Sequence, residues 1–101
     1  MIDIKIIDEN CPICHSFKKI DSSLFFNLIE VPFDQISEND PFYEHMEIKF
    51  SEQMVHLPLY IFEMLDGKFF SFTPENQAQL KKNAKTISNI RQEVNRYGQA
   101  T

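Results

Sequence analysis

Two cysteines separated by two residues, Cys11 and Cys14, stand where the hydrophobic pattern of the sequence changes its period. In residues 2–7 apolar and polar side chains alternate until the segment ends on two apolar residues, Ile6 and Ile7. This pattern is typical of a strand. After the cysteines, apolar residues recur at three- and four-residue steps: Phe17, Ile20, Leu24 and Leu28. This spacing predicts a helix that begins near Cys11 or Pro12, and proline is tolerated in a first helical turn.

The middle of the chain predicts a second strand and a weaker helix. Residues 28–33 are apolar enough for a strand, and Pro32 favours its end or an edge position. Residues 34–40 are polar and indicate a loop. A helical segment opens at Pro41, with apolar residues at four-residue steps: Phe42, Met46 and Phe50.

A hairpin and a long helix are predicted for the last part of the chain. Residues 59–65 are rich in β-branched and aromatic side chains, and Asp66-Gly67 joins them directly to residues 68–72. Thr73 and Pro74 suit the N-cap and first position of a helix over 75–97. Its apolar stripe comprises Leu80, Ala84, Ile87, Ile90, Val94 and Tyr97.

The order strand, helix, strand, helix, strand, strand, helix predicts an α/β fold. We expect a four-stranded mixed sheet flanked by three helices. A chain of 101 residues with 43% apolar content can build one core, and neither a repeat nor a linker divides it. The whole chain, residues 1–101, is therefore predicted to be a single domain.

Charge and hydropathy argue against several classes of partner. The net charge is −5, and the basic residues Lys81, Lys82, Lys85, Arg91 and Arg96 are interpreted as a solvated helix face. We expect no nucleic-acid partner. The N-terminus lacks the pattern of a signal peptide, and no stretch has the ~20 apolar residues of a membrane span. The expected compartment is a reducing cytoplasm, where such a cysteine pair is more often catalytic or metal-binding than structural.

The position of the cysteine pair suits thiol–disulfide exchange. At a helix N-terminus, free backbone N–H groups and the helix dipole stabilise a thiolate, which is the form that attacks a disulfide. Cys11 is therefore the predicted nucleophile, and Cys14, one turn further on, is the resolving thiol. Asp8 and Glu9 oppose thiolate formation in part. The pKa of Cys11 is expected to lie below the usual thiol value of about 8.5.

The element order, the tetrad at 11–14 and the segment 55–62 together resemble glutaredoxins of the thioredoxin superfamily. The resemblance implies a thioredoxin fold and an oxidoreductase that reduces protein disulfides or glutathione mixed disulfides. It also implies a cis peptide bond between Leu57 and Pro58, beside the dithiol. The substrate-binding residues that it implies are Pro12, Ile13, Leu57 and Pro58.

The sequence differs in two places from glutaredoxins that use glutathione, and both differences bear on which reductant this chain uses. The segment 70–74 lacks their paired glycines, and residues 8–10 are Asp-Glu-Asn where they tend to carry a basic residue. The carboxylates of glutathione would meet like charge there. No built-in cofactor is expected, and both glutathione and a thioredoxin-reductase-type enzyme stay open as reductant. Disulfide-containing proteins are the expected substrates of this chain, which we expect to be a monomer.

Other interpretations of the same residues remain. Cys11 to His15 match the Cys-x-x-Cys-His pattern of haem attachment, with Met46, Met54 or Met64 as the opposite ligand. A zinc site could take Cys11, Cys14 and His15 as ligands, but a structural zinc needs four, and His45 and His56 are not at the spacing of a second knuckle. An iron–sulfur site follows only from family analogy. A non-catalytic binding module is the alternative of a different class, with the long C-terminal helix as a docking element.

Overall fold

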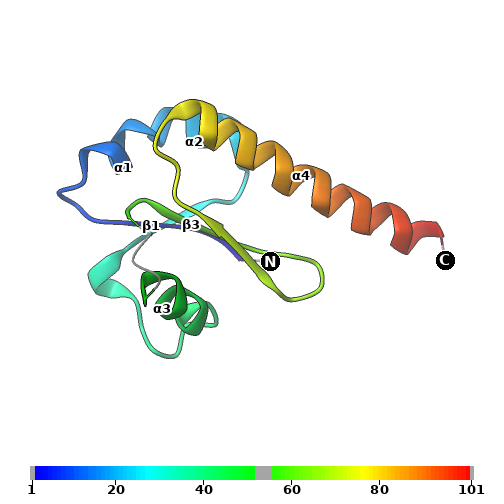
Figure 1. The fold of residues 1–101 in the computed structure, drawn as a ribbon, viewed down its shortest axis with the longest axis horizontal. Coiled ribbons are helices and arrows are strands. Elements are labelled where there is room, and N and C mark those ends of the chain that lie inside the picture. Colours follow the sequence, from blue (N-terminus) through cyan, green and yellow to red (C-terminus); the bar gives the residue numbers. More distant parts are fainter. Residues whose placement is uncertain (1, 52–55, 101) are drawn as a thin grey trace.

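Four strands form one mixed sheet in the order β2-β1-β3-β4 (Figure 1). The structure, a computed structural model, describes residues 2–51 and 56–100, with side chains described up to residue 92. The strands are β1 (Asp3–Ile7), β2 (Ile29–Pro32), β3 (Leu59–Glu63) and β4 (Phe69–Phe72). β1 lies parallel to β2 and antiparallel to β3, and β3 pairs with β4 in an antiparallel hairpin.

Helices cover both faces of this sheet. The α-helices are α1 (Pro12–Ser16), α2 (Lys18–Leu24), α3 (Tyr43–Ser51) and α4 (Gln77–Ala100), and a 3₁₀ turn, η1 (Phe33–Gln35), follows β2. α1, α2 and α4 lie on one face and α3 lies on the other, while the end of α4 extends past the sheet (Figure 1). None of the described helices, including α4, has the length and apolar content needed to cross a membrane.

The alternation of side chains along β1 and β3 divides the core into two clusters. On the α3 side, the buried residues are Ile4, Ile6, Phe42, Met46, Leu59 and Ile61. On the opposite side, Tyr60 and Phe62 pack with Phe17, Leu80 and Ile87. Successive strand residues point to opposite faces, so both faces of these two central strands are buried. The loop after β1 therefore follows a strand that is packed on both faces.

The predicted mixed α/β class and the four-stranded mixed sheet are confirmed. The first predicted helix is instead two helices, which makes four α-helices rather than three. The break falls at Phe17, whose backbone N–H donates to the carbonyl of His15. The carbonyl of Ile13, its expected helical partner, accepts from the hydroxyl of Ser16 at 2.8 Å. Phe17 itself is buried, with 3% of its surface exposed.

The predicted start of the last helix is wrong, because the helix begins three residues after Pro74, its predicted first position. α4 begins at Gln77, and the side chain of Asn76 accepts a hydrogen bond of 2.9 Å from the backbone N–H of Gln79. Asn76 therefore takes the N-cap role predicted for Thr73. The Thr73 hydroxyl donates to the carbonyl of His56 instead. The predicted stripe residues Val94 and Tyr97 lie outside the described side chains.

The described basic side chains of α4 do not form one solvated face, and Arg96 lies outside the described side chains. Lys81, Lys82 and Lys85 are exposed as predicted. Arg91 turns back to the sheet, where it donates to Asp3 at 2.6 Å and to the carbonyl of Glu63 at 2.8 Å. Its guanidinium lies 5.7 Å from the centre of the Phe62 ring. Arg91 thus links α4 to β1 and β3 and is not part of a surface for anions.

The β3–β4 turn depends on the backbone freedom of Gly67, which has φ +85°. An added Cβ would have no atom within 4 Å, so the cost of a side chain there is conformational only. We expect Gly67→Ala to lower the free energy of unfolding by about 1–2 kcal/mol. Urea unfolding measures the loss, with Lys68→Ala in the same turn as the control. Equal stability of the two variants would contradict this assignment.

Candidate functional site

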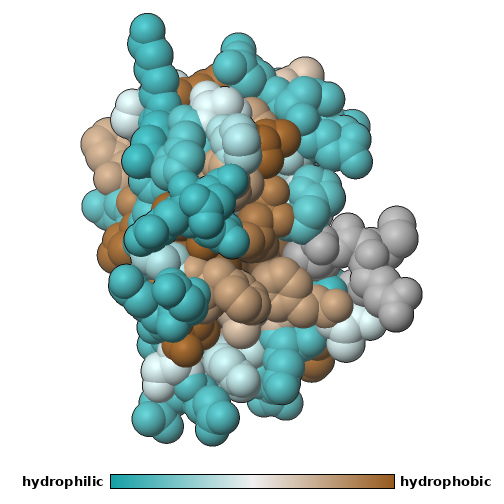
Figure 2. All heavy atoms as spheres, turned by 90° about the vertical axis from the view of Figure 1, so that its left-hand side faces the viewer, coloured by the Kyte–Doolittle hydropathy of each residue, from teal (hydrophilic) through white to brown (hydrophobic). Residues whose placement is uncertain are grey.

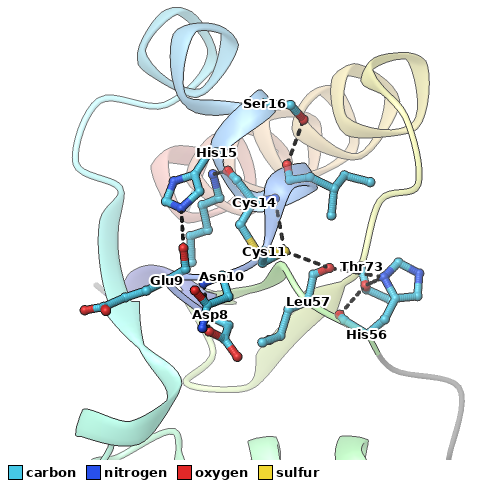
Figure 3. The surroundings of a disulfide bond; sticks show 12 residues. Asp8, Glu9, Asn10, Cys11, Cys14, His15, Ser16, His56, Leu57 and Thr73 are labelled. Carbon is cyan, nitrogen blue, oxygen red and sulfur yellow. Dashed lines mark hydrogen bonds between the residues drawn. A yellow bond between two sulfur atoms is a disulfide. The ribbon is translucent and has the colours of Figure 1, made fainter.

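Cys11 and Cys14 form a disulfide at the point where β1 passes into α1 (Figure 3). Their Cα atoms are 5.3 Å apart, within the usual range for a disulfide. Cys11 is half-buried just before the helix, and Cys14 is completely buried one turn further on. The two sulfurs therefore differ in their access to a partner, as the two predicted roles require.

The sulfur of Cys11 occupies the N-cap position of α1. It lies 3.2 Å from the backbone nitrogen of Cys14 and accepts a hydrogen bond from that N–H group. A serine or aspartate oxygen usually has this place. An ionised sulfur accepts such a bond more strongly than a neutral thiol, so the geometry stabilises the thiolate of Cys11.

The segment before β3 lies directly beside this sulfur. The peptide bond between Leu57 and Pro58 is cis, which confirms the prediction. The Leu57 carbonyl oxygen is 3.8 Å from the Cys11 sulfur, and Pro58 is buried. The Thr73 hydroxyl, after β4, contacts both the carbonyl and the ring nitrogen Nδ1 of His56 (Figure 3). These bonds fix the segment to the sheet.

The structure thus brings four predicted site residues together: Cys11, Cys14, Leu57 and Pro58. The other two, Pro12 and Ile13, form the first turn of α1, where Pro12 is exposed and Ile13 is half-buried. Figure 2 faces the end of the molecule at which α1 begins. Apolar surface lies across the middle of that face, between hydrophilic regions (Figure 2).

An acidic loop lies next to the dithiol. Asp8, Glu9 and Asn10 are exposed and line a shallow groove with Phe33 and Asp34. The Asp8 carbonyl accepts from the backbone N–H of Cys11 at 3.1 Å. Two exposed carboxylates therefore belong to the loop that leads into Cys11, where they disfavour an anionic ligand.

Three residues beneath the dithiol were not predicted to belong to the site. Lys5 is completely buried, and its ammonium donates to the Cys14 carbonyl at 2.7 Å and to Asp21 at 2.6 Å. The hydroxyl of Tyr60 donates to the other Asp21 oxygen at 2.7 Å. Burial and this hydrogen bond raise the pKa of Tyr60 far above its usual value, so the phenol stays protonated.

The described residues do not form a set of ligands for haem or for zinc. Nowhere among the described side chains, residues 2–51 and 56–92, do three His, Cys, Asp or Glu groups lie together as metal ligands would. The ring of His15 contacts the Glu9 carbonyl at 2.9 Å, and His45 contacts Ser71 at 2.9 Å. Met46 is buried in the core on the α3 side, and Met54 lies outside the described residues.

Comparisons with protein-family models, with curated proteins and with solved structures found no match for this chain. It is a mixed α/β protein with a Cys-x-x-Cys disulfide where the first strand meets the first helix.

Unequal burial of the two sulfurs predicts selective alkylation. When the disulfide is reduced, iodoacetamide should modify Cys11 at least about tenfold faster than Cys14, because reactivity requires an accessible thiolate. Peptide mass spectrometry of briefly treated native protein measures the ratio, and the unfolded protein in urea is the control in which both thiols react. Faster modification of Cys14 in the native protein would contradict the assigned roles.

Proposed function

We propose that this chain is a glutaredoxin-like thiol–disulfide oxidoreductase with a thioredoxin fold. The observation that carries the proposal is the Cys11–Cys14 disulfide at the start of α1, with the carbonyl before a cis proline 3.8 Å from the Cys11 sulfur. A parallel β1–β2 pair, joined through helices, and a terminal β3–β4 hairpin with α4 support the fold assignment.

The reaction is dithiol–disulfide exchange. The Cys11 thiolate attacks one sulfur of a substrate disulfide, so that a mixed disulfide forms and the other substrate sulfur leaves as a thiolate. Cys14 then loses its proton and attacks the Cys11 sulfur. The Cys11–Cys14 bond forms, the bond to the substrate breaks, and the second substrate sulfur leaves. Two electrons have passed to the substrate, whose thiolates take up two protons.

The substrate is a protein disulfide in an exposed or extended segment. Such a segment pairs with the backbone of Leu57 and packs on the first turn of α1, at Pro12 and Ile13. The acidic loop at residues 8–10 favours a protein substrate over glutathione, whose carboxylates would be repelled. The oxidised pair is then reduced by glutathione or by a thioredoxin-reductase-type enzyme in a reducing cytoplasm.

Two parallel assays test this proposal. Reduced protein is given insulin in one assay and a glutathione mixed disulfide in the other, with dithiothreitol alone as the background. In each assay the rate with protein is divided by the rate with dithiothreitol alone. We expect this ratio to be higher for the reduction of insulin than for the reduction of the glutathione mixed disulfide. If the protein catalyses neither reaction although its thiols titrate with Ellman's reagent, the proposal is refuted. That result would favour a binding module that keeps this fold.

A further inference from the structure

A buried polar network lies between the sheet and the helix that carries the dithiol. It consists of Lys5 on β1, Asp21 on α2 and Tyr60 on β3, and we call it the Lys5 network. Lys5 and Tyr60 are completely buried, and Asp21 is 7% exposed. The three side chains are joined by hydrogen bonds of 2.6 and 2.7 Å. The reaction described above uses none of their functional groups.

One bond of this network leaves it and ends on the dithiol segment. The Lys5 ammonium donates to the backbone carbonyl of Cys14 at 2.7 Å. Cys14 lies in a helix of five residues, where the last carbonyls have no intrahelical partner. A helix so short has little stability of its own. Its position therefore depends on tertiary contacts, and this bond holds the backbone that carries the resolving sulfur.

We propose that Lys5 is a positioning residue for the dithiol. Through its bond to the carbonyl of Cys14, Lys5 holds the resolving sulfur in the position from which that sulfur forms the disulfide with Cys11. The inference rests on the proposed function, since it concerns the second step of that exchange. In this step the Cys14 thiolate attacks the Cys11 sulfur, the S–S bond between them forms, and the substrate sulfur leaves. Lys5 touches neither sulfur in this step and transfers no proton.

The physical basis is effective concentration. Two groups held in a productive geometry react as if at a high concentration, because the entropy of bringing them together has already been lost. Lys5 can hold Cys14 only if Lys5 is itself fixed, and Asp21 on α2 supplies that support. Tyr60, whose raised pKa keeps it a donor, orients the Asp21 carboxylate in turn. Sheet, α2 and α1 are thereby held in one arrangement.

Replacement of the whole network tests the inference without leaving an unpaired buried charge. The triple variant Lys5→Met, Asp21→Leu, Tyr60→Phe substitutes apolar groups of similar volume, which proteins often tolerate. The double variant Lys5→Met, Asp21→Asn removes the bond to Cys14 more mildly, since Asn still accepts from Tyr60. The matched control is Asp3→Asn, Arg91→Met, which removes an ion pair of 2.6 Å elsewhere on β1.

The measurement is the equilibrium of the dithiol with reduced and oxidised glutathione, followed by alkylation and mass spectrometry. We expect the effective concentration of the thiol pair to fall about tenfold in both network variants, which raises the reduction potential by about 30 mV. The mixed disulfide of Cys11 with glutathione should persist correspondingly longer. The control should stay within twofold of the wild type, even where its stability is lower.

Two results would overturn the inference. One is a folded network variant whose effective concentration lies within twofold of the wild type. The other is failure of both network variants to fold while the control folds, because the network would then serve the fold rather than the dithiol. Loss of insulin reduction by the wild type would refute the proposed function alone, since the glutathione equilibrium requires only the two cysteines of this chain.

Discussion

Cys11→Ser is expected to abolish the reduction of protein disulfides, with a loss of at least about a hundredfold, because a serine hydroxyl does not replace a thiolate in attack on a disulfide. Cys14→Ser should behave differently, since its Cys11 still accepts the first half of the substrate. It should form the mixed disulfide at a rate near that of the wild type and then stop. Stopped-flow measurement of substrate thiol release, with the pre-reduced proteins, separates the two variants.

The control for these variants is Ser22→Ala, a change at an exposed serine on α2 whose hydroxyl donates to the nearby Lys19 carbonyl. It should retain the full rate. Comparable single-turnover rates in Cys11→Ser and Cys14→Ser would contradict the assignment of Cys11 as nucleophile. If Cys11→Ser kept its activity and Cys14→Ser lost it, Cys14 would be the attacking residue instead.

Lys5→Met should destabilise the protein by about 3–5 kcal/mol, because it leaves the Asp21 carboxylate buried without its partner. The change also removes the donor to the Cys14 carbonyl. This loss is a large share of the ~5–15 kcal/mol that a domain of this kind has in total. Urea unfolding followed by circular dichroism measures the difference in the free energy of unfolding.

Two further variants make that prediction specific. Lys19→Met changes a lysine that is exposed on α2, and it should alter the stability by no more than about 0.5 kcal/mol. Adding Asp21→Leu to Lys5→Met should restore most of the loss, because no unpaired buried charge then remains. A loss below about 1 kcal/mol in Lys5→Met alone would contradict the buried ion pair.

Local patterns were sufficient to predict the sheet and the dithiol. Strand alternation, the Asp66-Gly67 turn and the spacing of apolar residues are properties of short segments, and they located all four strands. The cysteine pair and Pro58 could be found in the same way, because each lies at the boundary of such a segment. The resemblance to glutaredoxins then correctly predicted the cis bond before Pro58.

Features that depend on distant partners were not predictable from these patterns. Lys5 occupies a polar position in an alternating strand, and nothing in that local pattern indicates that its side chain is buried. In the structure it is completely buried and bonds to the Cys14 carbonyl and to Asp21. The break at Phe17 is local, but the spacing of apolar residues does not indicate that the Phe17 N–H bonds to the carbonyl of His15 and not to that of Ile13. Thr73 suited an N-cap, but its hydroxyl bonds to His56, which is 17 residues away in sequence.

Capture of the mixed disulfide shows whether Cys11 exchanges disulfides with a substrate. Pre-reduced Cys14→Ser protein is mixed with a peptide that contains one disulfide, quenched with acid and examined by intact and peptide mass spectrometry. We expect a near-stoichiometric adduct on Cys11 in Cys14→Ser protein, and no lasting adduct when Cys14 is present. An unmodified Cys11, in folded protein whose thiol titrates with Ellman's reagent, would contradict the claim that this residue exchanges disulfides.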